Sequence, residues 1–183
     1  TLFKYSNLAV SLAGQIVQKV SGEAYADYVQ KHIFDPLGME NSSVNSDKKA
    51  HERLATGYGR RMPDGTRDVR PYQDVKGITP AGNITSTVED LARFVSLQFR
   101  NGRRGGSQIL DSRTLHEMHR VHWLCPDWKG GYGIGFFVSR QGDRTIIGHG
   151  GALDGYRSTI VFNEEEQIGV IVLINANDGD VDK

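Results

Sequence analysis

The sequence predicts an α+β fold built on an antiparallel sheet, and two observations carry that prediction. Apolar residues recur at helical spacing through much of the first two thirds of the 183-residue chain. The last third changes to short apolar segments separated by turn residues such as Gln141-Gly142-Asp143. Helices followed by consecutive strands on short turns are typical of α+β chains. We expect a partial domain over residues 1–183, with a helical part over 1–125 and C-terminal strands over 126–183.

Two helices are expected near the start of the chain. Ser6 can cap the first helix, which ends near Gly22. Its apolar stripe has i, i+4 spacing and comprises Leu8, Leu12, Ile16 and Val20. A second helix is predicted over residues 24–33 and is expected to stop at Asp35-Pro36.

The middle of the chain combines an irregular stretch with two further helices. Residues 41–77 are polar, show no sustained period and predict a long loop, either functional or mobile. A capping box then starts a helix, through either Ser86 with Glu89 or Thr87 with Asp90. Asn101-Gly102 is expected to end that helix, and residues 112–120 predict a shorter one.

Four strands are predicted in the last third of the chain. They cover residues 132–139, 145–149, 158–162 and 168–174. A sheet so close to the C-terminus needs a cover for its second face, so the chain reads as part of a larger domain. An unpaired sheet edge also predicts association, with a second copy of the chain or with a companion chain.

Composition excludes several classes of function. Lys plus Arg and Asp plus Glu both number 22, so there is no bulk charge to attract nucleic acid or an anionic membrane. The longest apolar stretch, residues 168–174, is too short to span a bilayer. A lone Cys125 excludes an intrachain disulfide and a metal cluster built from cysteines. We expect no nucleic-acid partner, no cofactor and no metal, and the small-molecule or peptide substrate is implied by the family resemblance described below.

Two short motifs carry residues suited to catalysis. Tyr5-Ser6-Asn7 places a phenol and a carboxamide at the start of a helix, and His149-Gly150-Gly151 follows a predicted strand. The two glycines carry no Cβ, so a ligand can approach the backbone closely. An exposed N–H of Gly151 or Ala152 could then stabilise a developing oxyanion. Each motif alone also fits a purely structural role.

In this order, Tyr-x-Asn and His-x-Gly resemble the second and third motifs of the penicillin-recognising serine hydrolases. That family includes class C β-lactamases, D-alanyl-D-alanine peptidases and related esterases. The surrounding segments YSNLAVSLAGQIVQKVSG, TPAGNITSTVEDLARF and GHGGALDGYRSTIVF are similar as well, and together they cover most of the chain. The resemblance implies a β-lactamase/transpeptidase-like fold and acyl transfer through a serine acyl-enzyme on an ester, amide or peptide.

The resemblance also implies roles for individual residues. Tyr5 would be the acid/base partner of the nucleophile, and its phenolate would need a nearby cation. Asn7 would orient the substrate amide, and the N–H of Ala152 would supply half of the oxyanion hole. His149 stands where many family members have Lys, which favours esterase or peptidase homologues over an efficient β-lactamase. Arg157 could compensate as a clamp for a substrate carboxylate.

The chain departs from the family pattern at one motif, Ser-x-x-Lys. Ser-x-x-Lys, which provides the nucleophile, should precede Tyr-x-Asn, but the only such string here is Ser46 to Lys49. We interpret that string as a coincidence and expect the nucleophile to lie outside this chain. The alternative is a non-catalytic module that binds peptides, cell-wall pieces or a protein partner. The resemblance suggests a periplasmic or secreted location, and the residues themselves leave the cytoplasm open.

Other candidate sites have simpler interpretations. His116, His119 and His122 are spaced by three, which spreads the rings around the helix and favours an exposed helix over a metal site. Trp123 and Trp128 could line an apolar pocket or pack a loop onto the sheet. We interpret residues 102–106, GRRGG, as a turn that ends a helix and carries two solvated arginines.

Overall fold

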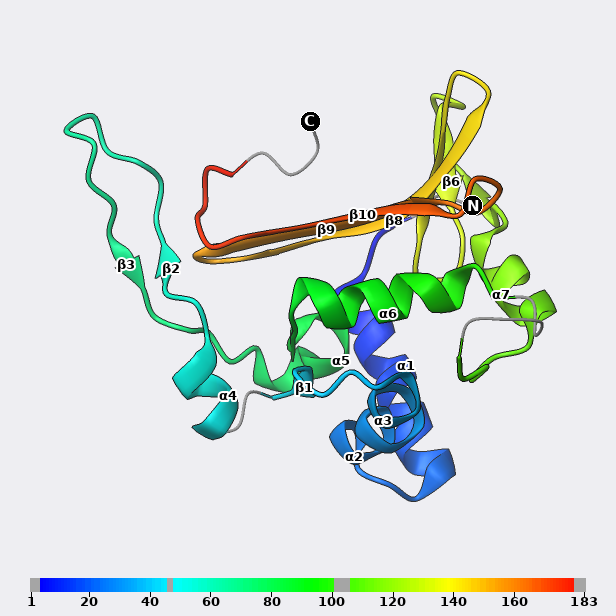
Figure 1. Ribbon diagram of the computed structural model, residues 1–183, viewed down its shortest axis with the longest axis horizontal. Helices are drawn as coiled ribbons and strands as arrows, with labels where there is room; N and C mark the ends of the chain where they lie inside the picture. Colours follow the sequence, from blue (N-terminus) through cyan, green and yellow to red (C-terminus); the bar gives the residue numbers. More distant parts are fainter. Residues whose placement is uncertain (1–3, 46–47, 101–105, 180–183) are drawn as a thin grey trace.

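The computed structural model describes residues 4–45, 48–100 and 106–179, and it arranges them in three layers (Figure 1). An antiparallel sheet forms the first layer and helix α6 (Val88–Gln98) lies across one face of it. The third layer lies beneath α6 and is formed by α1 (Asn7–Ser21), α2 (Tyr25–Val29), a π-helical turn (Gln30–Phe34) and α3 (Asp35–Leu37). The expected α+β class is confirmed.

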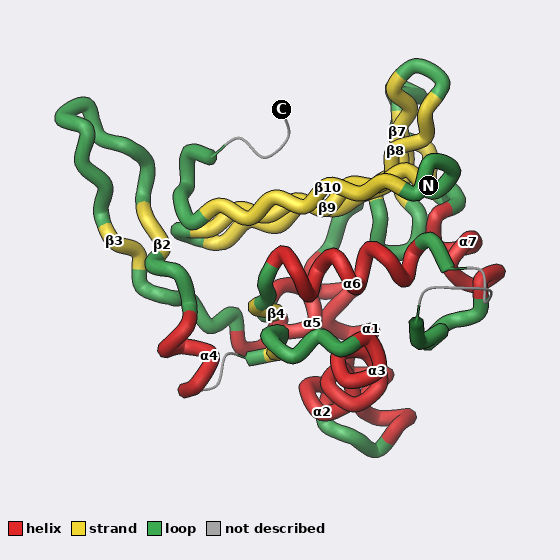
Figure 2. The backbone as a smooth tube through the Cα atoms, in the orientation of Figure 1, coloured by secondary structure: helices red, strands yellow, loops and turns green. Residues whose placement is uncertain are grey.

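The main sheet is a meander of six strands rather than the four predicted. Its strands are β5 (Trp123–Leu124), β6 (Gly130–Tyr132), β7 (Phe137–Gln141), β8 (Arg144–Leu153), β9 (Tyr156–Asn163) and β10 (Ile168–Ile174). They lie in the order β10-β9-β8-β7-β6-β5, and every neighbouring pair is antiparallel. Figure 2 shows β8, β9 and β10 as long strands that run side by side.

The predicted strand over 132–139 is wrong, because it contains a tight turn. The turn joins β6 to β7 and is closed by a hydrogen bond from Gly133 N–H to the Phe136 carbonyl, with Gly135 at φ +80°. A Cβ on Gly133 would lie 2.1 Å from the Met118 carbonyl oxygen, so only glycine fits there. The residues of the turn keep the alternation of a strand, which hides it in the sequence.

Strand β8 also continues past its predicted end at His149. It runs through both glycines to Leu153, and the turn to β9 comes later, at Asp154-Gly155. Strand β7 pairs with β8 only as far as Gly148. From His149 to Leu153 the strand is therefore paired with β9 on one side and open on the other.

Helix α1 has the predicted ends, and its apolar stripe is exposed. Ser6 Oγ accepts from the Ala9 N–H, and Gly22 closes the helix at φ +74°. The apolar stripe is 55–81% exposed at Leu8, Leu12, Ile16 and Val20. Within the described chain, α1 packs instead through Gly14, where a Cβ would lie 2.3 Å from Pro80.

The second helix does not stop at Asp35-Pro36, as the sequence suggested. A π-helical turn leads directly into α3, which ends at Gly38 with φ +68°. Pro36 lies in the first turn of α3, where its missing N–H has no partner to lose. Proline therefore starts a helical segment here instead of ending one.

Short elements connect the helical layers. Residues 41–77 hold β1 (Ser43–Val44), α4 (Lys48–Arg53), β2 (Gly57–Tyr58) and β3 (Val69–Arg70), followed by η2 (Lys76–Ile78), α5 (Thr79–Gly82) and β4 (Ile84–Thr85). β1 pairs with β4, and β2 with β3. Residues 41–77 therefore contain short paired strands and a helix, and are not the long irregular loop that was predicted.

The two later helices begin as the sequence indicates. Thr87 Oγ1 accepts from the Asp90 N–H, so Thr87 is the N-cap of α6. Helix α7 (Ser112–His119) is capped by Asp111. The expected helix end at Asn101-Gly102 and most of the GRRGG segment lie outside the described residues.

Helix α6 separates two apolar cores. Between α6 and the sheet lie Val95, Phe136, Val138, Ile147 and Phe162. On the other side of α6 lie Val29, Phe34, Leu37, Met39, Val44, Leu97 and Leu115. Val95 and Leu97 are two positions apart, which is about 200° around a helix, so they face opposite cores. Gly169 of β10 admits the side chain of Val95, since a Cβ there would lie 2.5 Å from Val95 Cγ1.

A buried carboxylate fixes the start of α6. Asp90 is fully buried and accepts from the Asn41 N–H at 2.7 Å, Ser42 Oγ at 2.9 Å and Arg93 Nη1 at 2.7 Å. Three donors compensate for the loss of hydration that a buried carboxylate suffers. Asp90 therefore ties α6 to the segment that follows α3.

We expect Leu97→Ala to lower the free energy of unfolding by about 2–5 kcal/mol, because Leu97 is 1% exposed and its removal leaves a cavity. Leu12→Ala is the matched control, since Leu12 is exposed on α1 and should cost about 0.5 kcal/mol or less. Urea unfolding followed by circular dichroism measures both. Equal losses in the two variants would contradict the assignment of the core.

Candidate active site

The structure brings Tyr5 and His149 together from opposite ends of the chain. Tyr5 precedes α1, and His149 lies on β8 at the point where the pairing with β7 ends. Their ring centroids are 6.1 Å apart, and Tyr5 Oη lies 3.3 Å from His149 Nε2. Both side chains are exposed, with Tyr5 at 55%, so a ligand can reach them.

The hydrogen bonds of His149 determine which atom donates to which. His149 Nδ1 lies 2.6 Å from the Gly150 carbonyl oxygen, which can only accept. Nδ1 must therefore carry a proton, which leaves Nε2 of the neutral ring with a lone pair. The Tyr5 hydroxyl then donates to Nε2. If the ring gains a second proton, the direction reverses, so this contact can pass a proton between phenol and imidazole.

The start of α1 places Asn7 close to Tyr5. Ser6 caps the helix in an extended conformation, and Asn7 is the first residue of α1. The Asn7 carbonyl accepts from Ser11 Oγ at 2.8 Å, and the residue as a whole is exposed. Its substrate-orienting role stays a prediction.

The segment Gly150 to Ala152 lies on the open part of β8. Alternate main-chain N–H groups of a paired strand point away from the partner, so in this segment some of them face the open edge. All three residues are exposed. A Cβ on Gly151 would lie 2.4 Å from Ser158 Oγ, so Gly151 is needed for packing between the strands and not only for access by a ligand. The oxyanion role stays a prediction.

The structure gives Arg157 contacts within the end of the β8–β9 hairpin. Its Nη1 donates to the Leu153 and Tyr156 carbonyls, both at 2.8 Å, and to Asn177 Oδ1 at 3.2 Å. Asn177 Oδ1 also accepts from the Gly155 N–H. These bonds stabilise the turn and account for one of the guanidinium nitrogens. The carboxylate clamp therefore stays a prediction that these contacts do not favour.

Two aromatic rings beside Tyr5 were not anticipated as site residues. The Tyr132 ring lies 6.3 Å from the Tyr5 ring, and Phe137 lies 5.1 Å from Tyr132 in an edge-to-face arrangement. The sequence shows the two residues only as part of a strand-like alternation. The contact between these two rings depends on the turn at Gly133–Phe136, because that turn pairs Tyr132 with Phe137 on neighbouring strands.

The family model for Beta-lactamase matches residues 1–183, which is the whole chain. The chain belongs to the beta-lactamase family. The fold and the resemblance expected from the motifs are therefore confirmed.

Relatives in the beta-lactamase family have varied names. Beta-lactamase-like protein 2 of Dictyostelium discoideum is 30% identical over 91% of this chain and 30% of its own length. The octameric penicillin-binding protein homologue of Pyrococcus abyssi is 30% identical with a TM-score of 0.83, over 96% of this chain and 39% of that one. D-amino acid amidase of Ochrobactrum anthropi SV3, complexed with L-phenylalanine amide, is 28% identical with a TM-score of 0.79. The match covers 100% of this chain and 52% of the amidase chain.

The chain spans about a third of the length of the curated relatives that it matches. Ser46, the serine of its one Ser-x-x-Lys string, lies outside the described residues. In the parts of the chain that the structure covers, no helix has the length and apolar character that a membrane span requires.

The three histidines do not form the exposed helix that their spacing suggested. His116 is exposed, but His119 is buried against Phe136 and Phe162, and His122 lies beyond the end of α7. Helical spacing alone could not show that the sheet core covers one of the three. Among the described residues, no three His, Cys, Asp or Glu side chains are placed to hold a metal ion.

His119 has one polar contact from each ring nitrogen, to α6 and to the β9–β10 turn, and a neutral ring can donate to only one of these two acceptors. Nε2 lies 3.1 Å from Gln98 Oε1, and Nδ1 lies 3.2 Å from Glu164 Oε2. Burial lowers the pKa of the imidazole below its ordinary value, and the Glu164 carboxylate opposes that shift.

We expect this lowered pKa to make stability depend on pH. Stability from His119 is fully present above the unfolded-state pKa of about 6.5 and is lost as pH falls from there toward the lower folded-state pKa. His119→Gln should reduce the loss between pH 7.5 and pH 5, while His51→Gln, at an exposed position on α4, should leave it unchanged. Urea midpoints at the two pH values test this; the same loss in all three proteins would contradict it.

Proposed function

We propose that this chain supplies the acid/base and substrate-binding part of a serine hydrolase, which acts through an acyl-enzyme on esters, amides or peptides. The nucleophile would come from residues outside the chain. The single observation that carries the proposal is the contact between Tyr5 Oη and His149 Nε2, which joins the second and third family motifs. Membership of the beta-lactamase family and the amidase relative support the same reaction class.

The proton transfers follow from the donor and acceptor assignments. The serine oxygen attacks the substrate carbonyl carbon, and its proton passes to the Tyr5 oxygen as Tyr5 gives its own proton to Nε2 of His149. The carbonyl electrons move to oxygen, where an N–H on the open part of β8 stabilises the charge. The oxyanion electrons then re-form the carbonyl, and the bond between its carbon and the leaving group breaks. At the same time His149 returns its proton to Tyr5, and Tyr5 protonates the leaving group. Water hydrolyses the acyl-enzyme by the same steps.

The histidine distinguishes this site from a site with a permanent cation. A neutral imidazole accepts the Tyr5 proton, whereas a lysine ammonium already carries all its protons at neutral pH. A substrate carboxylate gains less from His149 than from a lysine at that position. We therefore propose an esterase, amidase or peptidase activity in preference to efficient β-lactam hydrolysis.

A non-catalytic binding protein is the second candidate. It is favoured by one observation, since the only Ser-x-x-Lys string of the chain follows Tyr-x-Asn instead of preceding it. In that case the surface around Tyr5 and His149 would bind a peptide or cell-wall fragment without turnover.

We expect the intact protein that carries this chain to be labelled on a serine by a fluorophosphonate or a fluorescent penicillin. Tyr5→Phe should lower kcat/KM for a p-nitrophenyl ester or phenylalanine amide by roughly 10²–10⁴-fold, because the proton acceptor is lost. Steady-state kinetics and mass spectrometry of the adduct measure both effects.

Tyr28→Phe is the matched control, because Tyr28 also contacts a histidine, His32, at a ring distance of 4.4 Å on α2 and the π-helical turn. That variant should keep full activity. Absence of any labelled serine in the intact protein would overturn the enzyme and favour the binding protein.

A further inference from the structure

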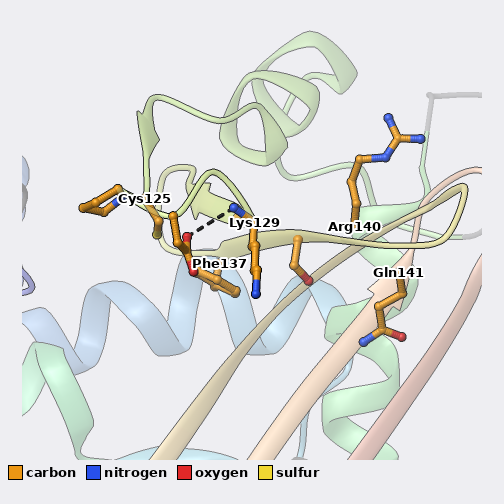
Figure 3. A pocket seen from close by; sticks show the side chains of 9 residues that line it. Cys125, Lys129, Phe137, Arg140 and Gln141 are labelled. Atoms are coloured by element: carbon orange, nitrogen blue, oxygen red, sulfur yellow. Dashed lines mark hydrogen bonds between the residues drawn. The ribbon is translucent and has the colours of Figure 1, made fainter.

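A cavity lies next to the row of aromatic rings that begins at Tyr5. It has a volume of about 510 Å³ and is lined by Cys125, Pro126, Asp127, Lys129, Gly130, Phe137, Ser139, Arg140 and Gln141. Figure 3 shows Lys129 beside Phe137, with Arg140 and Gln141 farther along β7. Phe137 is shared, because its ring forms one wall of the cavity and also contacts Tyr132, the neighbour of Tyr5.

The loop over this cavity is held in a defined shape. The Cys125 N–H donates to the Gly130 carbonyl at 2.8 Å, and the Trp128 N–H donates to the Cys125 carbonyl at 3.0 Å. Trp128 adopts φ +61°, an unfavourable conformation for a bulky residue, and its side chain is 81% exposed. Such strain on an exposed aromatic residue is typical of segments that contact ligands.

The charges around the cavity favour an anion. Asp127 is occupied within the loop, where Oδ1 accepts from the Lys129 N–H at 3.2 Å. The Lys129 ammonium makes no ion pair or hydrogen bond with any residue that the structure describes. Arg140 adds a second cation, which donates only to the Asp143 carbonyl among the described residues. The lining therefore carries two positive charges, on Lys129 and Arg140, and one negative charge, on Asp127, so its net charge is positive.

The wall formed by Phe137 is apolar. Gly130 leaves room for the ring, since a Cβ there would lie 2.7 Å from Phe137 Cζ. The ring of Phe137 can therefore extend over the strand, and it remains 38% exposed. A ligand for this cavity would need an apolar part against Phe137 and a negative group near Lys129.

We propose that the cavity between the loop 125–130 and β7 is a subsite for the anionic end of an acyl substrate, with Lys129 as the residue that determines this specificity. That the subsite serves acyl transfer rests on the proposed function, whereas binding of an anion does not. Ring-to-ring steps of 6.3 Å and 5.1 Å separate Tyr5 from Phe137. An extended acyl chain of about ten carbons covers both steps, at roughly 1.2 Å per bond.

The single cysteine of the chain provides a binding test that needs no turnover. Cys125 lines the cavity, so a bound ligand should slow its reaction with neutral methyl methanethiosulfonate. We expect 3-phenylpropionate to protect Cys125 at concentrations at least about fivefold lower than its neutral amide, since the two differ only in charge. Mass spectrometry of the modified chain gives the rate.

Lys129→Gln should abolish the difference between acid and amide. Lys19→Gln is the matched control, since it removes the same charge from the exposed end of α1 and should retain the difference. The anion subsite is overturned if the acid and the amide protect equally in the unaltered protein, or if Lys129→Gln still discriminates. A Cys125 that does not react in the folded chain would also overturn it, because the cavity would then be closed to small molecules.

A kinetic comparison tests the link to acyl transfer in the intact protein. Lys129→Gln should lower kcat/KM at least about fivefold for the mono-p-nitrophenyl ester of sebacic acid, a ten-carbon diacid, and leave p-nitrophenyl decanoate unchanged. Loss of both rates equally would contradict the link. If neither ester is hydrolysed although the acid protects Cys125, the proposed hydrolase fails while the anion site stands.

Discussion

Helix α6 is apolar on two opposite sides, and the architecture depends on satisfying both. Val95 packs toward the sheet while Leu97 packs toward the helical layer, so neither layer can move without exposing part of a core. Asp90 adds a polar constraint at the start of the helix, because three donors surround a carboxylate that has no access to water. Through α6, the helices that start at Asn7 are held at a fixed distance from the sheet that carries His149.

That fixed distance is what allows two residues 144 positions apart to share a hydrogen bond. Tyr5 is positioned by the capped start of α1, and α1 is held in turn by the close approach of Gly14 to Pro80. His149 is positioned by its pairing with β9, and the shorter strand β7 leaves room beside it. The candidate site thus forms where α1 begins and where the pairing of β7 with β8 ends.

Features fixed by local chemistry were predictable from the sequence. Ser6 and Gly22 define the ends of α1, and Thr87 caps α6, because caps depend on residues within one turn. The pairing of Tyr5 with His149 followed from a resemblance to a family and not from any local signal. The turn at Gly133–Phe136, the burial of His119 and the exposure of the α1 stripe could not be predicted, since each depends on residues distant in the sequence. The extension of β8 beyond His149 was missed because consecutive glycines usually mark a turn.

The open part of β8 has a consequence for how such a protein can change over evolutionary time. A main-chain N–H is lost only when its residue is replaced by proline, so the N–H groups on this edge are retained through most substitutions. The loop at 125–130 has no such protection, because what it presents is set by the identity of each residue. In the function proposed for this protein, substitutions in the loop would change selectivity and would leave the main-chain groups of β8 in place.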